Sequence, residues 1–395
     1  MSSVSVNKTH SRVYWICAIL LFIISFPKWF WGSAYIPTFA SILLLLFTFN
    51  NILNNKKELK AGIIALVCQF VIIYINANTY AESHNIIGYI LLFLKWIGFA
   101  TLFLCSPFFW KKCVDRFIKL LAIMLLLAII EHVLISFLGV QIVSPSYAEC
   151  PNNPNRGYNV FLFNVYLETM FGFFNRFFAF YDEPGVLGNI MMVLLYIQKF
   201  DLKKWYNIVF LISGLLSFSL AFYIAIIAYY VLFGRFRVKI AFGIIAIIFV
   251  YLFYSNEYVF DLLFGRLSIQ DGSLAGYNRE NMDFNDWFYT IDWRDYLFWG
   301  YQPRKAVVYA ASWKWAFALY GIIPSLIYLF VISYPRAKQV LQKKDILLGY
   351  VLMIIIWIQR PFVQFYLYVF LILIPFIYLS IGRDQNNKEI YYDNG

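Results

Sequence analysis

Long apolar stretches recur along almost the whole sequence, and they constrain the fold more than any other feature. They cover residues 13–31, 34–53, 61–78, 86–105, 117–139, 184–199, 205–233, 240–255, 307–332, 346–358 and 362–380. Most of them approach the roughly 20 residues that an α-helix needs to cross a bilayer. Hydrophobic residues make up 62% of the 395 positions, more than the interior of a soluble domain can bury. We therefore predict an all-α polytopic membrane protein in which residues 1–395 form one membrane domain.

The distribution of charge predicts an orientation in the membrane. With the N-terminus in the cytosol, the cytosolic connections carry 21 basic and 7 acidic residues, whereas the external ones carry 10 basic and 13 acidic residues. This asymmetry follows the positive-inside rule, so the net charge of +11 indicates no nucleic-acid partner. The remaining two charges, Lys95 and Glu131, fall within predicted spans. There they are costly unless they are paired or line a cavity, and a proton relay would use the same residues.

The stretch 205–233 has basic residues at both ends, in "KKWYNIV" and "FGRFRVK". Both ends should therefore face the cytosol, although a single span would cross the membrane. We predict two short helices that break near Ser213–Ser219, with neighbouring protein or water satisfying the backbone groups of the break. This gives about twelve transmembrane helices, with both termini cytosolic.

Two predicted external segments are long, covering residues 140–183 and 256–306. In the second, aromatic residues alternate with acids and arginines, as in "NDWFYTIDWRDYLFWGYQPRK". Sugars stack their C–H faces on aromatic rings while their hydroxyl groups bind carboxylates and amides. Tyr277, Trp287 and Trp293 are therefore candidate glycan-binding residues. The alternative is that such aromatic residues only anchor half-buried loops at the membrane interface.

Three external arginines, Arg176, Arg279 and Arg304, run against the positive-inside bias. A guanidinium group binds phosphate in a bidentate manner, so these residues are candidates to clamp a phosphate or pyrophosphate at the level of the lipid headgroups. The alternative is a set of local salt bridges with nearby acids such as Asp182 and Glu183.

Five motifs occur in order between residues 170 and 380. They are "NRFFAFYDEPGVLGN", "SFSLAFYIAIIAYYVLFGR", "GYNRE", "LFWGYQP" with "ASWKWAFALYGIIPSLIYLF", and "IQRPFVQFY". Their order and spacing resemble bacterial O-antigen polymerases of the Wzy type, within the O-antigen ligase and polymerase superfamily. The resemblance implies a C-type glycosyltransferase architecture with two large periplasmic loops and no metal or other cofactor. It also implies transfer of a glycan from undecaprenyl pyrophosphate to the terminal sugar of another lipid-linked repeat unit, at the periplasmic face of the inner membrane.

The resemblance carries five residues over to this chain. Arg176 matches the arginine before the Glu-Pro element, and Glu183 with Pro184 match that element itself. Arg279 matches the arginine that opens the helical part of the second loop, and Arg360 matches that of the closing Arg-Pro pair. Arginines that hold the pyrophosphate more tightly in the transition state would lower the barrier. Glu183 is the candidate to activate the acceptor hydroxyl. An acid followed by proline is also typical of a helix N-terminus, and this capping role is compatible with the first.

The ligases of the superfamily carry a histidine shortly before the helix that reads "WKWAFALYGIIP" here, where this chain has Ser312 and its neighbours. Its three histidines lie outside both large loops, which favours a polymerase over a ligase. The general base stays open, and alternatives to Glu183 are Asp286, Asp292 and Asp295.

A lipid-linked oligosaccharide flippase, or another secondary transporter, is the alternative from a different class. It too would have about twelve spans and charges within the membrane. The resemblance further implies a polysaccharide chain-length regulator as a partner.

Overall fold

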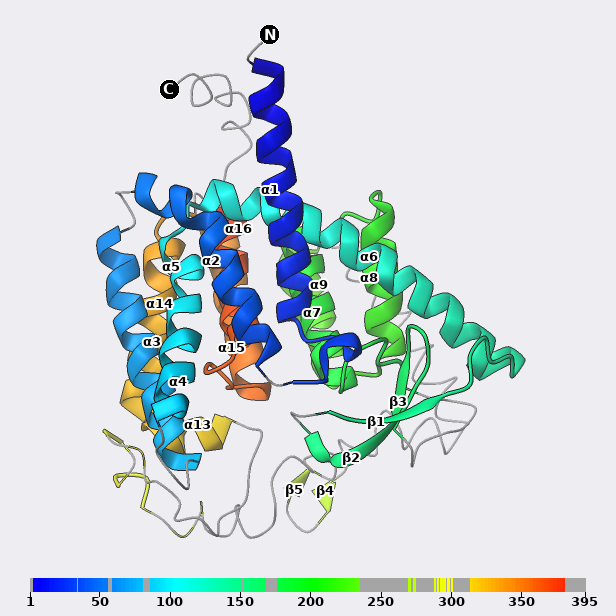
Figure 1. The fold of residues 1–395 in the computed structure, drawn as a ribbon. Helices are drawn as coiled ribbons and strands as arrows, with labels where there is room; N and C mark the ends of the chain where they lie inside the picture. Colours follow the sequence, from blue (N-terminus) through cyan, green and yellow to red (C-terminus); the bar gives the residue numbers. More distant parts are fainter. Residues whose placement is uncertain are drawn as a thin grey trace.

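The computed structural model describes residues 3–33, 35–55, 59–80, 86–150, 153–167, 176–234, 313–340 and 342–380, with a few positions between 269 and 300. This part of the chain is mostly helical, as Figure 1 shows. Its helices are α1 (Ser3–Ile24), the short 3-10 helix η1 (Lys28–Phe30), α2 (Ile36–Asn54), α3 (Leu59–Tyr80), α4 (Ile86–Gly98), α5 (Ala100–Leu104), α6 (Pro107–Leu138), α7 (Pro184–Ile197), α8 (Trp205–Leu216), α9 (Leu220–Phe233), α13 (Trp313–Tyr320), α14 (Ile322–Ala337), α15 (Lys343–Gln359) and α16 (Tyr366–Leu379). Its strands are β1 (Ser146–Cys150), β2 (Asn153–Val160), β3 (Val165–Leu167), β4 (Ile269–Gln270) and β5 (Ser273–Leu274). The prediction of a mainly helical protein is confirmed.

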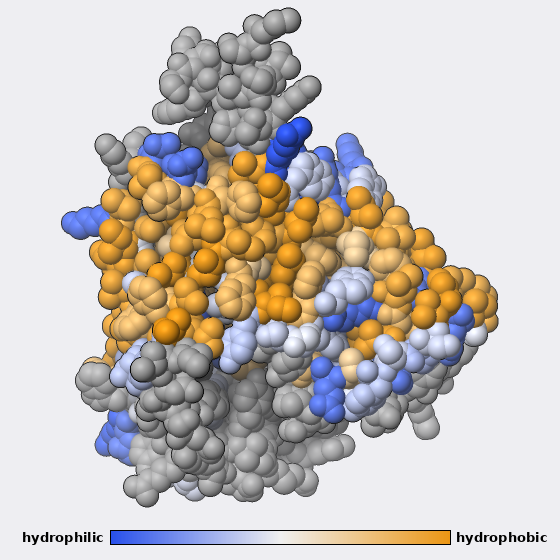
Figure 2. Space-filling view, viewed as in Figure 1, coloured by the Kyte–Doolittle hydropathy of each residue, from blue (hydrophilic) through white to orange (hydrophobic). Residues whose placement is uncertain are grey.

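Two of these helices, α2 and α6, are long and apolar enough to cross a membrane. Helices α13 and α14 are together long and apolar enough to cross a membrane if they are counted as one span, although the angle between them is 105°. Several further apolar helices are shorter, among them α7, α8, α9 and α16. Figure 2 shows hydrophobic residues across the middle of one face and polar residues gathered toward its two ends.

The predicted helix break within 205–233 is confirmed. Helix α8 ends at Leu216 and α9 begins at Leu220, with Phe218 between them at a φ of 48°. Both short helices pack against α7. A Cβ added at Gly188 of α7 would lie 2.5 Å from the Cβ of Ser219, so the absence of a side chain lets the break approach α7 closely. This places the α8–α9 break beside the first turns of α7.

Several predicted helix boundaries were wrong, for local reasons. Helix α6 begins at Pro107 rather than near residue 117, because Ser106 caps it by accepting a hydrogen bond from Phe109 N at 3.3 Å. Helix α1 ends at Ile24 rather than at 31, since Phe26 adopts a φ of 58° before Pro27. The stretch 307–332 is interrupted at Gly321, whose φ of 93° suits glycine. The predicted span 240–255 lies outside the described residues.

The core of the bundle is formed around two helices that are buried on all sides. Every residue of α7 is buried, and so are most residues of α16. Helix α16 packs against α7, α6, α14 and α15. Such helices have no polar face, which explains why their sequences are almost entirely apolar, with Asn189 of α7 as an exception.

A small antiparallel sheet with the strand order β1-β2-β3 lies at one end of the bundle, which we call the sheet end (Figure 1). The sequence analysis did not anticipate it. Tyr158 pairs with Leu167 and Val160 with Val165, and the register shifts between Glu149 and Cys150. One face of the sheet contacts the connection between α1 and α2 through a buried cluster of Phe26, Trp31, Cys150, Tyr158, Val165 and Phe178.

Candidate functional site

The segment 176–183, which carries the Glu-Pro motif, crosses the sheet end just before α7 begins. Its backbone is held by three hydrogen bonds to three different parts of the chain. Phe177 N donates to Leu216 O at 3.0 Å, Val165 N donates to Ala179 O at 2.8 Å, and Lys28 N donates to Phe180 O at 2.8 Å. The segment is therefore tied to the end of α8, to β3 and to η1.

The side chains of residues 177–181 are buried among aromatic neighbours. The ring centroid of Phe180 lies 5.3 Å from that of Trp29 and 5.5 Å from that of Phe22. Tyr181 Oη and Ser25 Oγ are 3.1 Å apart and share a hydrogen bond. Burial raises the pKa of Tyr181, and the hydrogen bond with Ser25 opposes this in part. Tyr181 is thus a neutral phenol that helps to fix the segment against the end of α1.

Arg176 reaches the α8–α9 break. Its Nε donates to Ser217 O at 3.3 Å and its Nη2 donates to Phe218 O at 3.1 Å. These carbonyl groups follow the last turn of α8, where the helix dipole is negative and backbone acceptors lack helical partners. Arg176 therefore stabilises the break through two of its donor groups.

Glu183 is the N-cap residue of α7, with an extended backbone (φ −145°, ψ 144°) and Pro184 at the first helical position. Its carbonyl oxygen accepts a hydrogen bond from Val186 N at 3.1 Å. Its side chain makes no capping hydrogen bond with the helix. The backbone of Glu183 thus starts the helix, as the motif predicts, while its carboxylate is directed elsewhere.

The carboxylate of Glu183 forms an ion pair with Arg360, through Oε2 and Nη2. The side chain of Glu183 is 18% exposed and that of Arg360 is 7% exposed. Arg360 follows α15 directly, so the pair joins the start of α7 to the end of α15. Nε of Arg360 is buried and has no hydrogen-bond partner among the described residues. Sequence analysis named both residues but did not predict that they pair.

The chain after Arg360 is fixed from two other helices. Gln69 on α3 donates from Nε2 to Val363 O at 2.8 Å, and Tyr328 on α14 donates to Gln69 Oε1. The guanidinium carbon of Arg360 lies 6.0 Å from the ring centroid of Phe362. Arg360 is therefore positioned by a buried, hydrogen-bonded turn.

Four candidates, Tyr277, Arg279, Trp287 and Arg304, lie outside the described residues, as does Asp286. Trp293 is described and is 53% exposed, with the guanidinium of Arg294 5.8 Å from its ring centroid.

The other two alternative bases, Asp292 and Asp295, share one exposed turn. Asp292 Oδ1 accepts from Arg294 N at 3.0 Å, and Asp292 O accepts from Asp295 N at 2.9 Å. The described structure does not bring Trp293, Asp292 or Asp295 into the Glu183–Arg360 pair.

Sequence analysis missed two buried bases, Lys28 and Lys314, which are 9% and 6% exposed. Lys314 lies on α13 with its ammonium 5.8 Å from the ring centroid of Phe288. The signal was present, because both residues are among the bases on the predicted external side, against the positive-inside bias.

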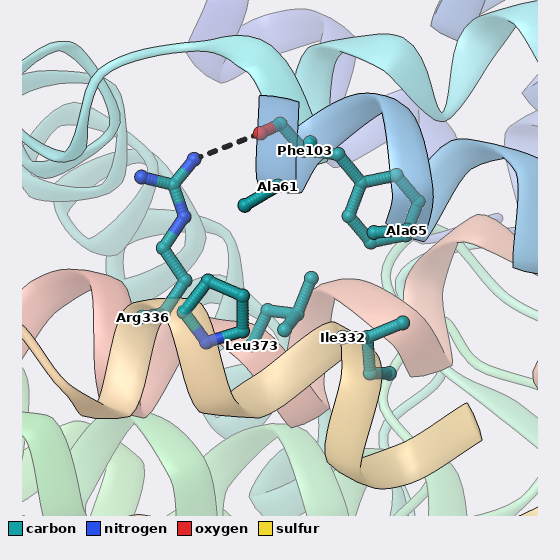
Figure 3. Close-up of a pocket in the computed structure, with 8 residues that line it drawn as sticks. Ala61, Ala65, Phe103, Ile332, Arg336 and Leu373 are labelled. Carbon is teal, nitrogen blue, oxygen red and sulfur yellow. Dashed lines mark hydrogen bonds between the residues drawn. The ribbon is translucent and has the colours of Figure 1, made fainter. Parts of the chain in front are cut away.

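A small pocket between α3, α5, α14 and α16 holds none of the predicted site residues. Figure 3 shows Arg336 at its edge, pointing toward the carbonyl of Phe103. The two are joined by a hydrogen bond of 3.0 Å, and the same nitrogen donates to Cys105 O at 2.9 Å. Arg336 therefore stabilises the end of α5. Within the described residues, no group of three or more His, Cys, Asp or Glu side chains is placed to hold a metal ion.

Compared with known proteins, this chain matches no protein-family profile, no curated protein and no solved structure.

Proposed function

We propose that this chain is an integral membrane glycosyltransferase that polymerises lipid-linked repeat units of a bacterial surface polysaccharide, such as O-antigen. The observation that carries the proposal is the ion pair between Glu183 and Arg360. It unites an acid and an arginine from two of the five motifs whose order resembles that of O-antigen polymerases, although the two motifs lie far apart in the sequence. The hydrophobic surface in Figure 2 and the apolar helices support a location in a membrane. The excess of basic residues on the predicted cytosolic side supports an orientation in which the sheet end faces the periplasm of the inner membrane.

Arg360 supplies the positive charge that the leaving group needs. In the proposed reaction, the bond between the anomeric carbon of the donor sugar and the pyrophosphate oxygen breaks, and undecaprenyl pyrophosphate leaves with the bonding electrons. The Nε–Nη2 edge of a guanidinium can bind two phosphate oxygens, and at Arg360 the Nε position is unused among the described residues. A fixed and buried guanidinium stabilises the negative charge as it grows.

Glu183 accepts the proton in this scheme. The hydroxyl oxygen of the acceptor sugar forms the new bond to the anomeric carbon, and its proton passes to the carboxylate. When phosphate oxygens bind Arg360, they compete with the carboxylate of Glu183 for its guanidinium, which frees the carboxylate to accept a proton. The ion pair therefore couples binding of the donor to activation of the acceptor.

Arg176 has a supporting role. It holds the α8–α9 break, which lies beside the first turns of α7 through the contact of Gly188 with Ser219. Its guanidinium adds positive charge to the same end of the bundle. Arg279, Arg304, Tyr277, Trp287 and Trp293 remain candidates to bind pyrophosphate and glycan from the second loop.

The test is glycan length in a strain that lacks this gene. A missing polymerase leaves single repeat units on the lipid core, and the full-length gene restores the polymer. Absence of even the single repeat, with lipid-linked units retained in the cytosol, would indicate a flippase instead. Long polymer that accumulates on the undecaprenyl carrier and does not reach the lipid core would indicate a ligase.

Complementation with Glu183→Gln tests the site. Membrane levels equal to wild type together with single-repeat glycans are expected. Wild-type polymer from this variant would remove Glu183 from the reaction.

A further inference from the structure

Glu131 on α6 is a buried carboxylate, 1% exposed, that is bound by a turn of the sheet end. Leu162 N donates to its Oε1 at 2.9 Å, and Phe163 N donates to its Oε2 at 2.8 Å. Asn164 Nδ2 also donates to Oε2, at 2.9 Å. A buried carboxylate is stable only when donors replace the water that it has lost. The turn 161–164, which joins β2 to β3, supplies three of them and is thereby fixed to α6.

Asn164 attaches the same turn at two further points. Its side chain is fully buried, and Nδ2 also donates to Ala128 O at 2.8 Å, one helical turn before Glu131. Its backbone carbonyl accepts from Phe161 N at 2.9 Å and from Lys28 Nζ at 3.3 Å. One residue therefore connects α6, the turn and η1.

The attachment continues into the segment 176–183. Val165 follows Asn164 directly, and its N donates to Ala179 O. Lys28 uses its backbone N to hold Phe180 O while its side chain holds Asn164. Two of the three backbone hydrogen bonds that fix the segment 176–183 are thus donated by residues attached to Asn164. Val165 is its neighbour in the sequence, and Lys28 is its hydrogen-bond partner.

The segment depends on such support because its conformation is unfavourable by itself. Ala179 has a φ of 48°, in the left-handed region that residues with a side chain rarely adopt. A residue held there is strained and persists only when its surroundings impose the conformation. The hydrogen bond from Val165 to Ala179 is part of that surrounding structure.

The geometry points to Glu131 as a positioning residue, which fixes the turn 161–164 and, through Asn164 and Lys28, sets the position of the segment that carries Arg176 and Glu183. This is a different role from pairing with Lys95. The ammonium of Lys95 instead lies 4.7 Å from the ring centroid of Phe365. The consequence for glycan transfer rests on the proposed function, whereas the attachment itself does not.

Hydrogen–deuterium exchange of the full-length protein in nanodiscs tests the attachment, with Glu131→Gln as the variant. Glutamine keeps the size of the side chain, but its NH₂ group cannot accept the hydrogen bonds that a carboxylate oxygen accepts. We expect exchange to become about tenfold faster in peptides covering 157–167 and in peptides covering 176–187. Spread to the second region is the signature of a positioning role, since a purely local role would alter only the first.

Asp345→Asn is the matched control. Asp345 lies on α15, far from the turn 161–164 in the sequence, and it is also buried, at 9% exposed. Its Oδ2 forms an ion pair with Lys199 Nζ at 3.0 Å. Its neutralisation should leave exchange in both peptides at the wild-type rate. Equal acceleration by both variants would show a general loss of stability and would overturn the proposal.

Transfer kinetics give a second measure, with a purified lipid-linked repeat unit as substrate. Because Glu131 is 1% exposed and therefore closed off from substrate, Glu131→Gln should lower kcat about tenfold and leave the KM for the donor within about threefold. Faster exchange in both regions, together with no transfer by the wild-type protein, would support the attachment and count against the proposed function alone. Exchange that changes only in 157–167, or in neither region, would overturn the positioning role.

If Glu131→Gln does not yield folded protein, Asn164→Ala provides the same test. It keeps the carboxylate of Glu131 with its two backbone donors and removes the side-chain donor to Glu131 and to Ala128. Faster exchange in 176–187 is again expected, and wild-type exchange there would overturn the proposal.

Discussion

Glu183 and Arg360 form a largely buried ion pair that connects the N-terminus of α7 to the C-terminus of α15. Glu183 serves as the N-cap residue through its backbone, so its carboxylate is available to pair with Arg360, which belongs to the last of the five motifs. The pair has both a structural consequence and, under the proposed function, a chemical one. The two can be separated by experiment.

Arg360→Met should destabilise the protein because it removes the guanidinium that pairs with the largely buried carboxylate of Glu183. Loss of one partner of a fully buried pair costs about 3 to 5 kcal/mol, which is an upper bound here because Glu183 is 18% exposed, whereas replacing both partners is often close to neutral. The double variant Arg360→Met/Glu183→Gln should therefore recover most of the lost stability, measured by thermal unfolding in one detergent. Under the proposed function it should still produce only single-repeat glycans. Long polymer from the double variant would contradict a role for the pair in transfer.

Arg176→Ala should loosen the α8–α9 break. It removes the donors to Ser217 O and Phe218 O, and a buried carbonyl that loses its partner costs about 1 to 3 kcal/mol. We expect faster hydrogen exchange in peptides covering 211–223. Arg294→Ala, at an exposed turn, is the control and should leave those peptides unchanged. Unchanged exchange in Arg176→Ala would show that the break is held by α7 alone.

The sequence predicted the helices well where local signals agreed. The apolar run with an acid and a proline before it predicted α7 to begin at residue 184, and basic residues on both sides of 205–233 predicted the α8–α9 break. The sheet was not predicted because "SYAECPNNPNRGYNV" lacks a clear alternation of apolar and polar residues. Its strands are fixed instead by long-range contacts, such as those of Cys150 and Tyr158 with Phe26 and Trp31.

The site was predicted as a set of residues but not as an arrangement. Residue type and motif order selected Arg176, Glu183 and Arg360, yet no sequence spacing shows that Glu183 meets Arg360 while Arg176 turns toward a helix break. The same limit applies to Glu131. Its cost within an apolar helix indicates a partner or a cavity, but the sequence does not say which residue the partner is. The actual partners are mainly backbone N–H groups of a turn, which no side-chain pattern encodes.

Gly188→Ala should destabilise the protein despite the higher helix propensity of alanine. The new Cβ would lie 2.5 Å from the Cβ of Ser219, so either α7 or the α8–α9 break must shift, at a cost of about 1 to 3 kcal/mol. Adding Ser219→Gly removes the obstacle and should restore most of the loss in thermal unfolding. Gly32→Ala, where an added Cβ meets nothing within 4 Å, is the control. A stable Gly188→Ala single variant would contradict close contact between α7 and the break.

Lys28 should make the stability of the sheet end depend on alkaline pH. Burial lowers the pKa of Lys28 from 10.5 to about 8, and the charge of Glu131 opposes this shift in part. Between these two pH values the unfolded chain binds more protons at this site than the folded protein, so the free energy of unfolding rises with pH across that window. The whole window corresponds to roughly 3 kcal/mol at most.

Wild type should therefore gain stability relative to Lys28→Met between about pH 8 and pH 10, measured by thermal unfolding of both proteins in the same detergent. The comparison cancels the titration of every other group that the two proteins share. A difference in stability that stays constant over this range would mean that Lys28 keeps an ordinary pKa, and hence that its ammonium is not desolvated beside Asn164 and Trp29.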